Sequence, residues 1–160
     1  MATGQKTERQ ILPEPTRDQV VSHLQENLAN LSDLALQGKQ AHWNLVGRRF
    51  FPFHEQLDLI VDSARKASDD VAERIAALGT WADGRADAIA SQTNLERFPD
   101  GRQSVEAAVT LIADRLETTV QHLRQSIEAL DDLDLVSQDL LIGVAADLEK
   151  HLWMVQAQEE

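Results

Sequence analysis

Apolar residues recur every three or four positions along most of this chain, which is the period of one face of an α-helix. Four such segments cover about residues 16–46, 52–78 and 105–130, and the stretch that follows residue 134. Ser104 precedes the third segment as a helix N-cap would. No segment alternates with the two-residue period of a strand, and no internal repeat is present. The pattern therefore predicts an all-α protein with four long amphipathic helices.

Residues with special conformational properties mark several of the predicted ends. Thr16, followed three residues later by Gln19, resembles a capping box at the start of the first helix. Residues 1–15 have little apolar periodicity, so we expect them to form a flexible tail. Pro52 suits the first turn of the second helix, and Gly79 suits the turn that ends it.

A long connection separates the second helix from the third. Within it, residues 86–91 could form a short helix, and residues 98–101 have the composition of a turn. Four long amphipathic helices pack as a bundle, and a long connection at this point is typical of a crossover that returns the chain along the bundle. We therefore predict a four-helix bundle with a short extra helix between helices 2 and 3.

Composition and charge narrow the possible functions. The 160 residues include no Cys, which excludes disulfides, zinc–thiolate sites and cysteine nucleophiles. No stretch approaches the ~18 apolar residues of a membrane span, and the N-terminus lacks an apolar signal core, so we expect a cytoplasmic protein. The net charge of −12 attracts cations and disfavours binding to the phosphates of nucleic acids.

Five potential metal ligands have suggestive spacing: His42, His54, Asp58, Asp69 and Glu73. His54 and Asp58 are four residues apart, as are Asp69 and Glu73, so each pair shares one face of the second helix. Asp69 follows Asp58 by eleven residues. This spacing places the two side chains only about 20° apart around the helix axis but roughly 16 Å apart along it. The two pairs therefore form one stripe and cannot bind the same ion within one chain.

The numbering of these residues fits two antiparallel copies of the second helix. The residue numbers of His54 and Glu73 add up to 127, and those of Asp58 and Asp69 do as well. A two-fold axis at the midpoint would place His54 against Glu73 of the other copy, and Asp58 against Asp69 of the other copy. Such a dimer would have two identical sites.

The predicted two-fold axis falls near Ser63 and Ala64. These residues and Ala67 are small, so we expect them to line the crossing and allow close approach. His42, late in the first helix, could contribute from one side. Imidazole with carboxylate suits Fe(II), Mn(II) or Zn(II), so the ligand types do not select the metal. A single His–Asp or Asp–Glu pair with a spacing of four residues is also common on the solvent-exposed face of a helix that binds no metal.

Several segments resemble signatures of the Dps family in the ferritin superfamily. They are KQAHWN at residues 39–44, HEQLD at 54–58, DDVAER at 69–74, LG at 78–79 and DLEKHLW at 147–153. The resemblance covers roughly residues 16–158, and we expect this range to form a single ferritin-like domain. The motifs are specific as a set, although HW or LW alone would be weak.

The resemblance implies an iron-oxidising subunit of a homo-oligomeric shell with twelve copies. Fe(II) would be oxidised by hydrogen peroxide in preference to oxygen, and the Fe(III) mineral would be stored inside the shell. The site would take His42, His54 and Asp58 from one chain and Asp69 and Glu73 from another. This division agrees with the one reached from helix geometry.

Other residues have two interpretations each. Lys39 could orient a site carboxylate or lie at the surface, and Trp43 and Trp153 could intercept radicals near the site, although core packing is favoured for both. Asp134 and Asp139 fall where the family lines its acidic pores, but Asp134 is equally suited to be a helix N-cap. Three further histidines are expected at the surface or at helix ends: His23, His122 and His151.

Two other functional classes remain open. Some Dps proteins bind DNA through Lys-rich tails, but this tail offers Lys6, Arg9 and Arg17 against Glu8 and Glu14, so DNA binding is doubtful. A non-catalytic helical assembly module is the other alternative. A di-iron site within one bundle would need Glu-x-x-His motifs, and no His has a Glu three residues before it.

Overall fold

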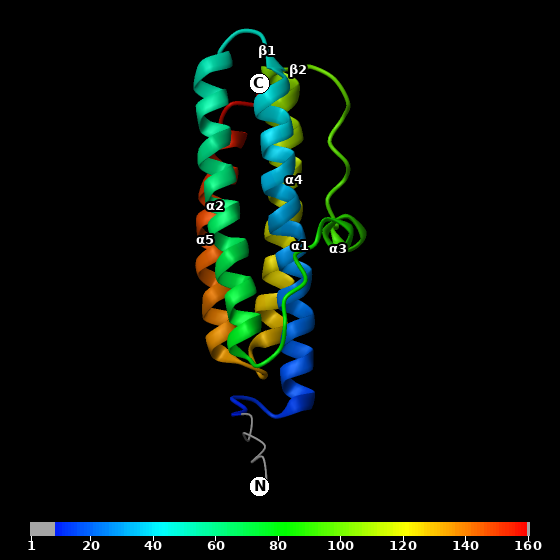
Figure 1. The fold of residues 1–160 in the computed structure, drawn as a ribbon. Coiled ribbons are helices and arrows are strands. Elements are labelled where there is room, and N and C mark those ends of the chain that lie inside the picture. The colour runs from blue at the N-terminus through cyan, green and yellow to red at the C-terminus, as the bar shows by residue number, and fades with distance from the viewer. Residues whose placement is uncertain (1–8, 160) are drawn as a thin grey trace, which may run out of the picture.

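The computed structural model describes residues 9–159, which fold into a four-helix bundle with a short fifth helix at its side (Figure 1). This arrangement confirms the predicted fold. The helices are α1 (Glu14–Asn44), α2 (Phe50–Ala77), α3 (Ala86–Gln92), α4 (Val105–Leu130) and α5 (Leu135–Gln156), and the strands are β1 (Leu45–Val46) and β2 (Gln103–Ser104).

The connection between α2 and α4 crosses the whole length of the bundle. Figure 1 shows it running from the far end of α2, through α3, to the end where α2 began. There β2 pairs in parallel with β1, with Leu45 opposite Gln103 and Val46 opposite Ser104. The prediction that the first helix continues to Val46 is therefore wrong, because these two residues become extended to pair with the crossover. Gly47 then turns the chain with a φ of 115°.

The first helix begins earlier than its sequence pattern indicated. Its first residue is Glu14, and its N-cap is Pro13, which makes no side-chain capping bond. Thr16 lies inside the helix, so the predicted capping box does not form. Pro15 is tolerated there because the first-turn N–H groups have no partner within the helix. Residues 1–8 of the predicted tail lie outside the described residues.

The other caps agree with the sequence. The Ser104 side chain accepts from the amide of Ala107 at the start of α4, and Asp134 caps α5. The apolar core runs along the bundle axis, and no helix within residues 9–159 is long and apolar enough to cross a membrane. The largest fully buried side chains come from all four long helices: Leu24, Leu31, Leu34, Phe53, Leu57, Ile60, Ile75, Ile112, Leu116, Leu123, Leu130 and Leu141.

A glycine allows α1 and α2 to approach closely just before the ends that carry the candidate ligands. Gly38 is buried in α1, and a Cβ atom built on it would lie 2.7 Å from Cγ2 of Val61 in α2. Val61 is fully buried and β-branched, so its methyl group has little freedom to move away. The missing side chain at Gly38 therefore sets the distance between the two helices.

We predict that Gly38→Ala lowers the free energy of unfolding by about 1–3 kcal/mol through overpacking. This is opposite to the effect of helix propensity, which favours Ala over Gly by about 1 kcal/mol. Urea unfolding followed by circular dichroism measures the difference. Gly143→Ala in α5 is the matched control, because a Cβ atom there meets nothing within 4 Å. A Gly38→Ala variant as stable as the wild type would contradict the prediction.

Candidate metal centre

The close approach of α1 and α2 brings two candidate ligands face to face. The rings of His42 and His54 are stacked, with their centroids 3.5 Å apart and an interplanar angle of 24°. Nδ1 of His42 lies 3.0 Å from the carbonyl oxygen of His54, and Nδ1 of His54 lies 3.1 Å from the carbonyl oxygen of His42. The two residues thus hold each other through a reciprocal pair of contacts.

This reciprocal contact assigns the protons on both rings. A carbonyl oxygen can only accept, so each Nδ1 must carry a hydrogen and donate it. In the neutral rings, Nε2 then carries the lone pair that a metal ion needs. A hydrogen bond from the other ring nitrogen is also the usual way in which a protein orients a metal-binding histidine. The ring of Phe50 stacks on His54 at 5.0 Å and covers it further.

Asp58 lies beside the two histidines. The Lys39 ammonium donates to its Oδ1, which also lies 3.3 Å from Nδ1 of His42. The hydrogen bond from Lys39 lowers the pKa of Asp58, and partial burial opposes it with a smaller effect. The carboxylate is therefore ionised at neutral pH. Of the two roles considered for Lys39, the structure supports the orientation of a site carboxylate.

Asp69 and Glu73 lie on the same helix but farther along it, and both are exposed. Within residues 9–159, no three His or acidic side chains of one chain converge so that they could hold a metal ion. The candidate ligands therefore form two incomplete groups. One contains His42, His54 and Asp58, and the other contains Asp69 and Glu73.

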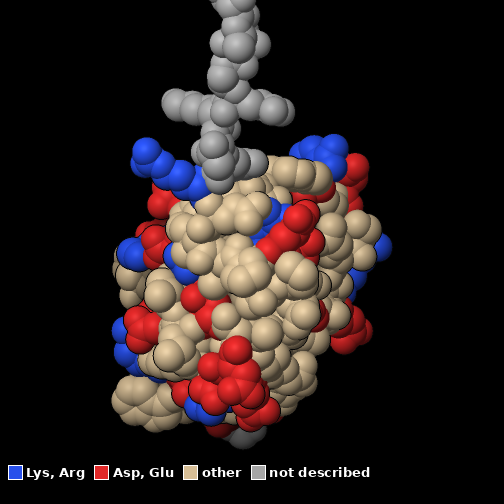
Figure 2. Space-filling view, turned by 90° about the horizontal axis from the view of Figure 1, so that it is seen from below, with Lys and Arg blue, Asp and Glu red and all other residues tan. Residues whose placement is uncertain are grey.

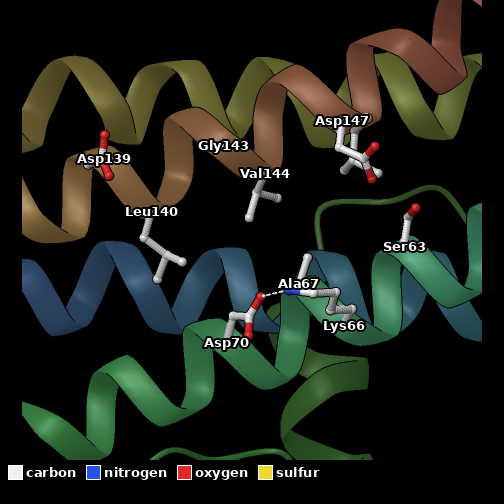
Figure 3. Close-up of a pocket in the computed structure, with 10 residues that line it drawn as sticks. Ser63, Lys66, Ala67, Asp70, Asp139, Leu140, Gly143, Val144 and Asp147 are labelled. Carbon is white, nitrogen blue, oxygen red and sulfur yellow. Dashed lines mark hydrogen bonds and ion pairs between the residues drawn. The ribbon is translucent and has the colours of Figure 1, made fainter.

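The small residues of α2 do not line the exposed stripe as predicted. Ala64 is fully buried in the core and Ala67 is 7% exposed, while Ser63 faces α5 (Figure 3). The Oγ atom of Ser63 lies 2.9 Å from Nε2 of His151. The prediction was wrong because the level of a residue along a helix does not determine its face, and each residue is rotated by about 100° from the last.

His151 was also predicted wrongly, since it is 5% exposed and lies between α2 and α5. Burial lowers its pKa, and the nearby Asp147 opposes this effect. Ser63 and Asp147 line a cavity of about 470 Å³ between the two helices (Figure 3). Asp139, one of the two candidate pore residues, lines it as well. The i,i+4 spacing of Asp147 and His151 was the available sequence signal for this polar cluster.

The other candidate pore residue has a structural role. Asp134 accepts hydrogen bonds from the amide of Ser137 at 3.2 Å and from the guanidinium of Arg74 at 2.8 Å. Burial raises its pKa, but the hydrogen bonds from Ser137 and Arg74 outweigh burial and lower it overall. Its side chain caps α5 and is 8% exposed, so the N-cap interpretation is confirmed, while a role in a pore stays a prediction.

Both tryptophans considered for radical interception are exposed, and the preference for core packing was wrong. Trp43 is 71% exposed and Trp153 is 67% exposed. Trp43 follows His42 directly in α1. Leu36 on the same helix is 59% exposed as well.

Comparison with known proteins places this architecture in a family. The family model of the ferritin-like domain matches residues 21–160. A DNA protection during starvation protein from Mycolicibacterium smegmatis is 41% identical over 141 residues, which are 88% of this chain and 77% of the relative. One from Agrobacterium fabrum is 33% identical over 147 residues, 91% of each chain. This chain belongs to the ferritin-like Dps family.

Solved Dps structures support the same assignment. A structure of Mycobacterium smegmatis Dps matches with a TM-score of 0.90 and 39% identity, covering 94% of this chain and 93% of that chain. DpsA14 from Streptomyces coelicolor matches with a TM-score of 0.88 and 35% identity, covering 92% and 88%. The fold and the family predicted from the sequence are both confirmed.

We predict that His151 makes the bundle sensitive to mild acid. Its pKa is lower in the folded chain than its usual value of 6.5, so the unfolded chain takes up the proton first as the pH falls. As the pH falls below 6.5, the free energy of unfolding should therefore decrease. The decrease should stop once the pH is below the pKa of His151 in the folded chain.

His151→Gln should remove this part of the pH dependence while keeping a polar group opposite Ser63. Urea unfolding of both proteins between pH 8 and pH 5 measures the effect, and the pH 8 values provide the baseline. Parallel pH profiles for the two proteins would mean that the pKa of His151 is the same in the folded and unfolded chains, which would contradict the prediction.

Proposed function

We propose that this protein oxidises Fe(II) at a site that two copies of the chain build together. His42, His54 and Asp58 come from one copy, and Asp69 and Glu73 come from the other. The observation that carries this proposal is the separation of the ligands. Both groups lie on α2 or against it, on one exposed stripe, and neither is sufficient alone.

The geometry of α2 supports an antiparallel pair. The helix is continuous from Phe50 to Ala77, so the two groups cannot fold back on each other. An antiparallel copy related by a two-fold axis brings the second group of one chain to the first group of the other. The exposed Trp43, which follows His42 in α1, provides apolar surface that pairing would remove from water.

The ligand set suits iron chemistry. Imidazole nitrogens bind Fe(II), and carboxylate oxygens suit the harder Fe(III) product. Two Fe(II) ions oxidised together give hydrogen peroxide two electrons, and with two protons it becomes two molecules of water. A single Fe(II) would supply one electron and release a hydroxyl radical. Iron is therefore a substrate here, and pairing the ions avoids the damaging route.

The expected assembly is a hollow cytoplasmic shell of twelve copies in which the Fe(III) mineral is stored. Hydrogen peroxide is the expected oxidant in preference to oxygen. The relatives are named for DNA protection during starvation. For this chain we propose that protection comes from the removal of Fe(II) and peroxide.

A mixing experiment tests whether the site is shared. One variant carries His42→Gly with His54→Gly, and the other carries Asp69→Ala with Glu73→Ala. Each variant alone should lose fast Fe(II) oxidation, because every site in its shells contains a damaged half. A mixed pair has one site with two intact halves and one with two damaged halves. Random pairing on co-expression should therefore restore roughly a quarter of the wild-type sites.

Stopped-flow absorbance with Fe(II) and hydrogen peroxide measures the recovery, and native mass spectrometry verifies that the shells are mixed. The control combines separately purified shells of the two variants without subunit exchange, and it should show no recovery. Background rates in verified mixed shells would mean that each site is built within one chain.

DNA binding is expected to be weak near neutral pH and physiological salt. The net charge is −12, and on the face in Figure 2 the Lys and Arg side chains are interspersed with Asp and Glu. This face therefore has no basic patch that could bind DNA phosphates and release their counterions. A gel shift with plasmid DNA, run with a chelator to exclude bridging by Mg(II), measures this. A version with an added Lys-rich tail is the positive control, and strong retention of the natural chain would contradict the prediction.

A further inference from the structure

The exposed stripe of α2 contains two charged residues between the candidate iron-binding groups. We define the α2 stripe as His54, Asp58, Asp62, Arg65, Asp69 and Glu73. The residue numbers of Asp62 and Arg65 also add up to 127. We propose that Asp62 of each copy pairs with Arg65 of a second copy, and that these two ion pairs fix the orientation and register of the dimer. This inference rests on the proposed shared site.

The helical geometry places both residues on the surface that would face a second copy. At about 100° per residue, Asp62 lies about 40° to one side of Asp58, and Arg65 lies about 20° to its other side. In an antiparallel pair with its axis at the midpoint of the stripe, Asp62 of one helix is level with Arg65 of the other. The axis repeats the contact, so two opposite-charge pairs flank it.

Both side chains are free to make this contact. Asp62 and Arg65 are exposed, and within residues 9–159 neither forms an ion pair at 4.0 Å or less, although they are three residues apart on one helix. The neighbouring Lys66 differs, because its ammonium lies 2.5 Å from Asp70 (Figure 3). Lys66 and Asp70 line the cavity toward α5 and lie off the α2 stripe.

In such a dimer, Arg65 would reduce the electrostatic repulsion between the two stripes. It is the only Lys or Arg of the α2 stripe, which otherwise carries four carboxylates and one histidine. Two antiparallel stripes would bring these carboxylates together, and like charges across an interface oppose association. Arg65 of each copy places a positive charge near the axis, where the two stripes are closest.

The charge pattern also distinguishes this register from others. A parallel pair would set Asp62 against Asp62 and Arg65 against Arg65, which is repulsive at both positions. An antiparallel pair shifted by about one turn would bring Arg65 to Asp58, and a shift of about two turns the other way would bring it to Asp69. Either shift would occupy a carboxylate that iron needs. Only the register centred on the stripe gives Arg65 a partner that is not a candidate iron ligand.

Charge reversal tests the pairing directly. Asp62→Arg alone puts two arginines of one chain against two of the other, and Arg65→Asp alone opposes four aspartates. Each single variant should associate at least ~10-fold more weakly than the wild type. The double variant with both changes should associate like the wild type. A mixture of the two single variants should form mixed dimers in preference to either homodimer, because each contact then has opposite charges.

Native mass spectrometry over a concentration series measures association and distinguishes mixed from homogeneous dimers by mass. Asp114→Arg on α4 and Arg102→Asp before β2 are controls with the same changes in net charge at exposed residues outside the α2 stripe. Both controls should associate normally. Circular dichroism verifies that every variant is folded.

Iron oxidation by the same proteins separates this inference from the proposed function. If both single variants associate like the wild type and oxidise Fe(II) rapidly, the ion pairs do not set the register, while the shared site stands. A second outcome is that charge reversal weakens association, that mixing the single variants restores it, and that the wild type oxidises no Fe(II). In that case the ion pairs are supported and the proposed function fails. If the double variant and the mixture both remain as weak as the single variants, the inference is overturned.

Discussion

The rigidity of one helix is the constraint from which the other features follow. The α2 helix runs without interruption for 28 residues and carries candidate acidic ligands in both of its halves. Asp58 and Asp69 are on one face but roughly 16 Å apart along the axis, because a helix rises ~1.5 Å per residue. No rearrangement of side chains can close this distance. With a shared face and a fixed separation, the proposed iron chemistry would depend on a second chain.

The packing of α1 against α2 positions the candidate ligands His42 and His54. Gly38 lets α1 approach α2 closely enough for His42 to stack on His54 one turn farther along. Each ring then donates through Nδ1 to the carbonyl oxygen of the other residue, so both are held in the form that presents Nε2 to a metal ion. The packing of two apolar faces thus determines the orientation of the candidate ligands and which nitrogen of each neutral ring carries the hydrogen, a link that periodicity alone does not reveal.

The sequence predicted those parts of the molecule that depend on local periodicity. The four long helices follow from apolar spacing, and the spacing of Asp58 and Asp69 predicted their common face. Prediction from the sequence failed where the environment of a residue depends on contacts between elements. Ser63 and Ala64 suit a close helix crossing equally well on either face, and only the position of α5 shows that they point inward. Trp43 is exposed because, within residues 9–159, no other element covers its side chain, and the spacing of apolar residues does not indicate this.

In the proposed dimer, iron binding and association would be thermodynamically linked. In the single chain, Lys39 neutralises Asp58, while Asp69 and Glu73 remain exposed to solvent. Association would bring Asp69 toward Asp58 and Glu73 toward His54, which adds repulsion between carboxylates in the absence of metal. Iron bound between them would remove that repulsion, so it would stabilise the dimer by the same free energy with which the dimer strengthens iron binding. A site divided in this way avoids binding iron in the unassembled chain, where an Fe(II) ion with an incomplete ligand set could react with peroxide by the one-electron route.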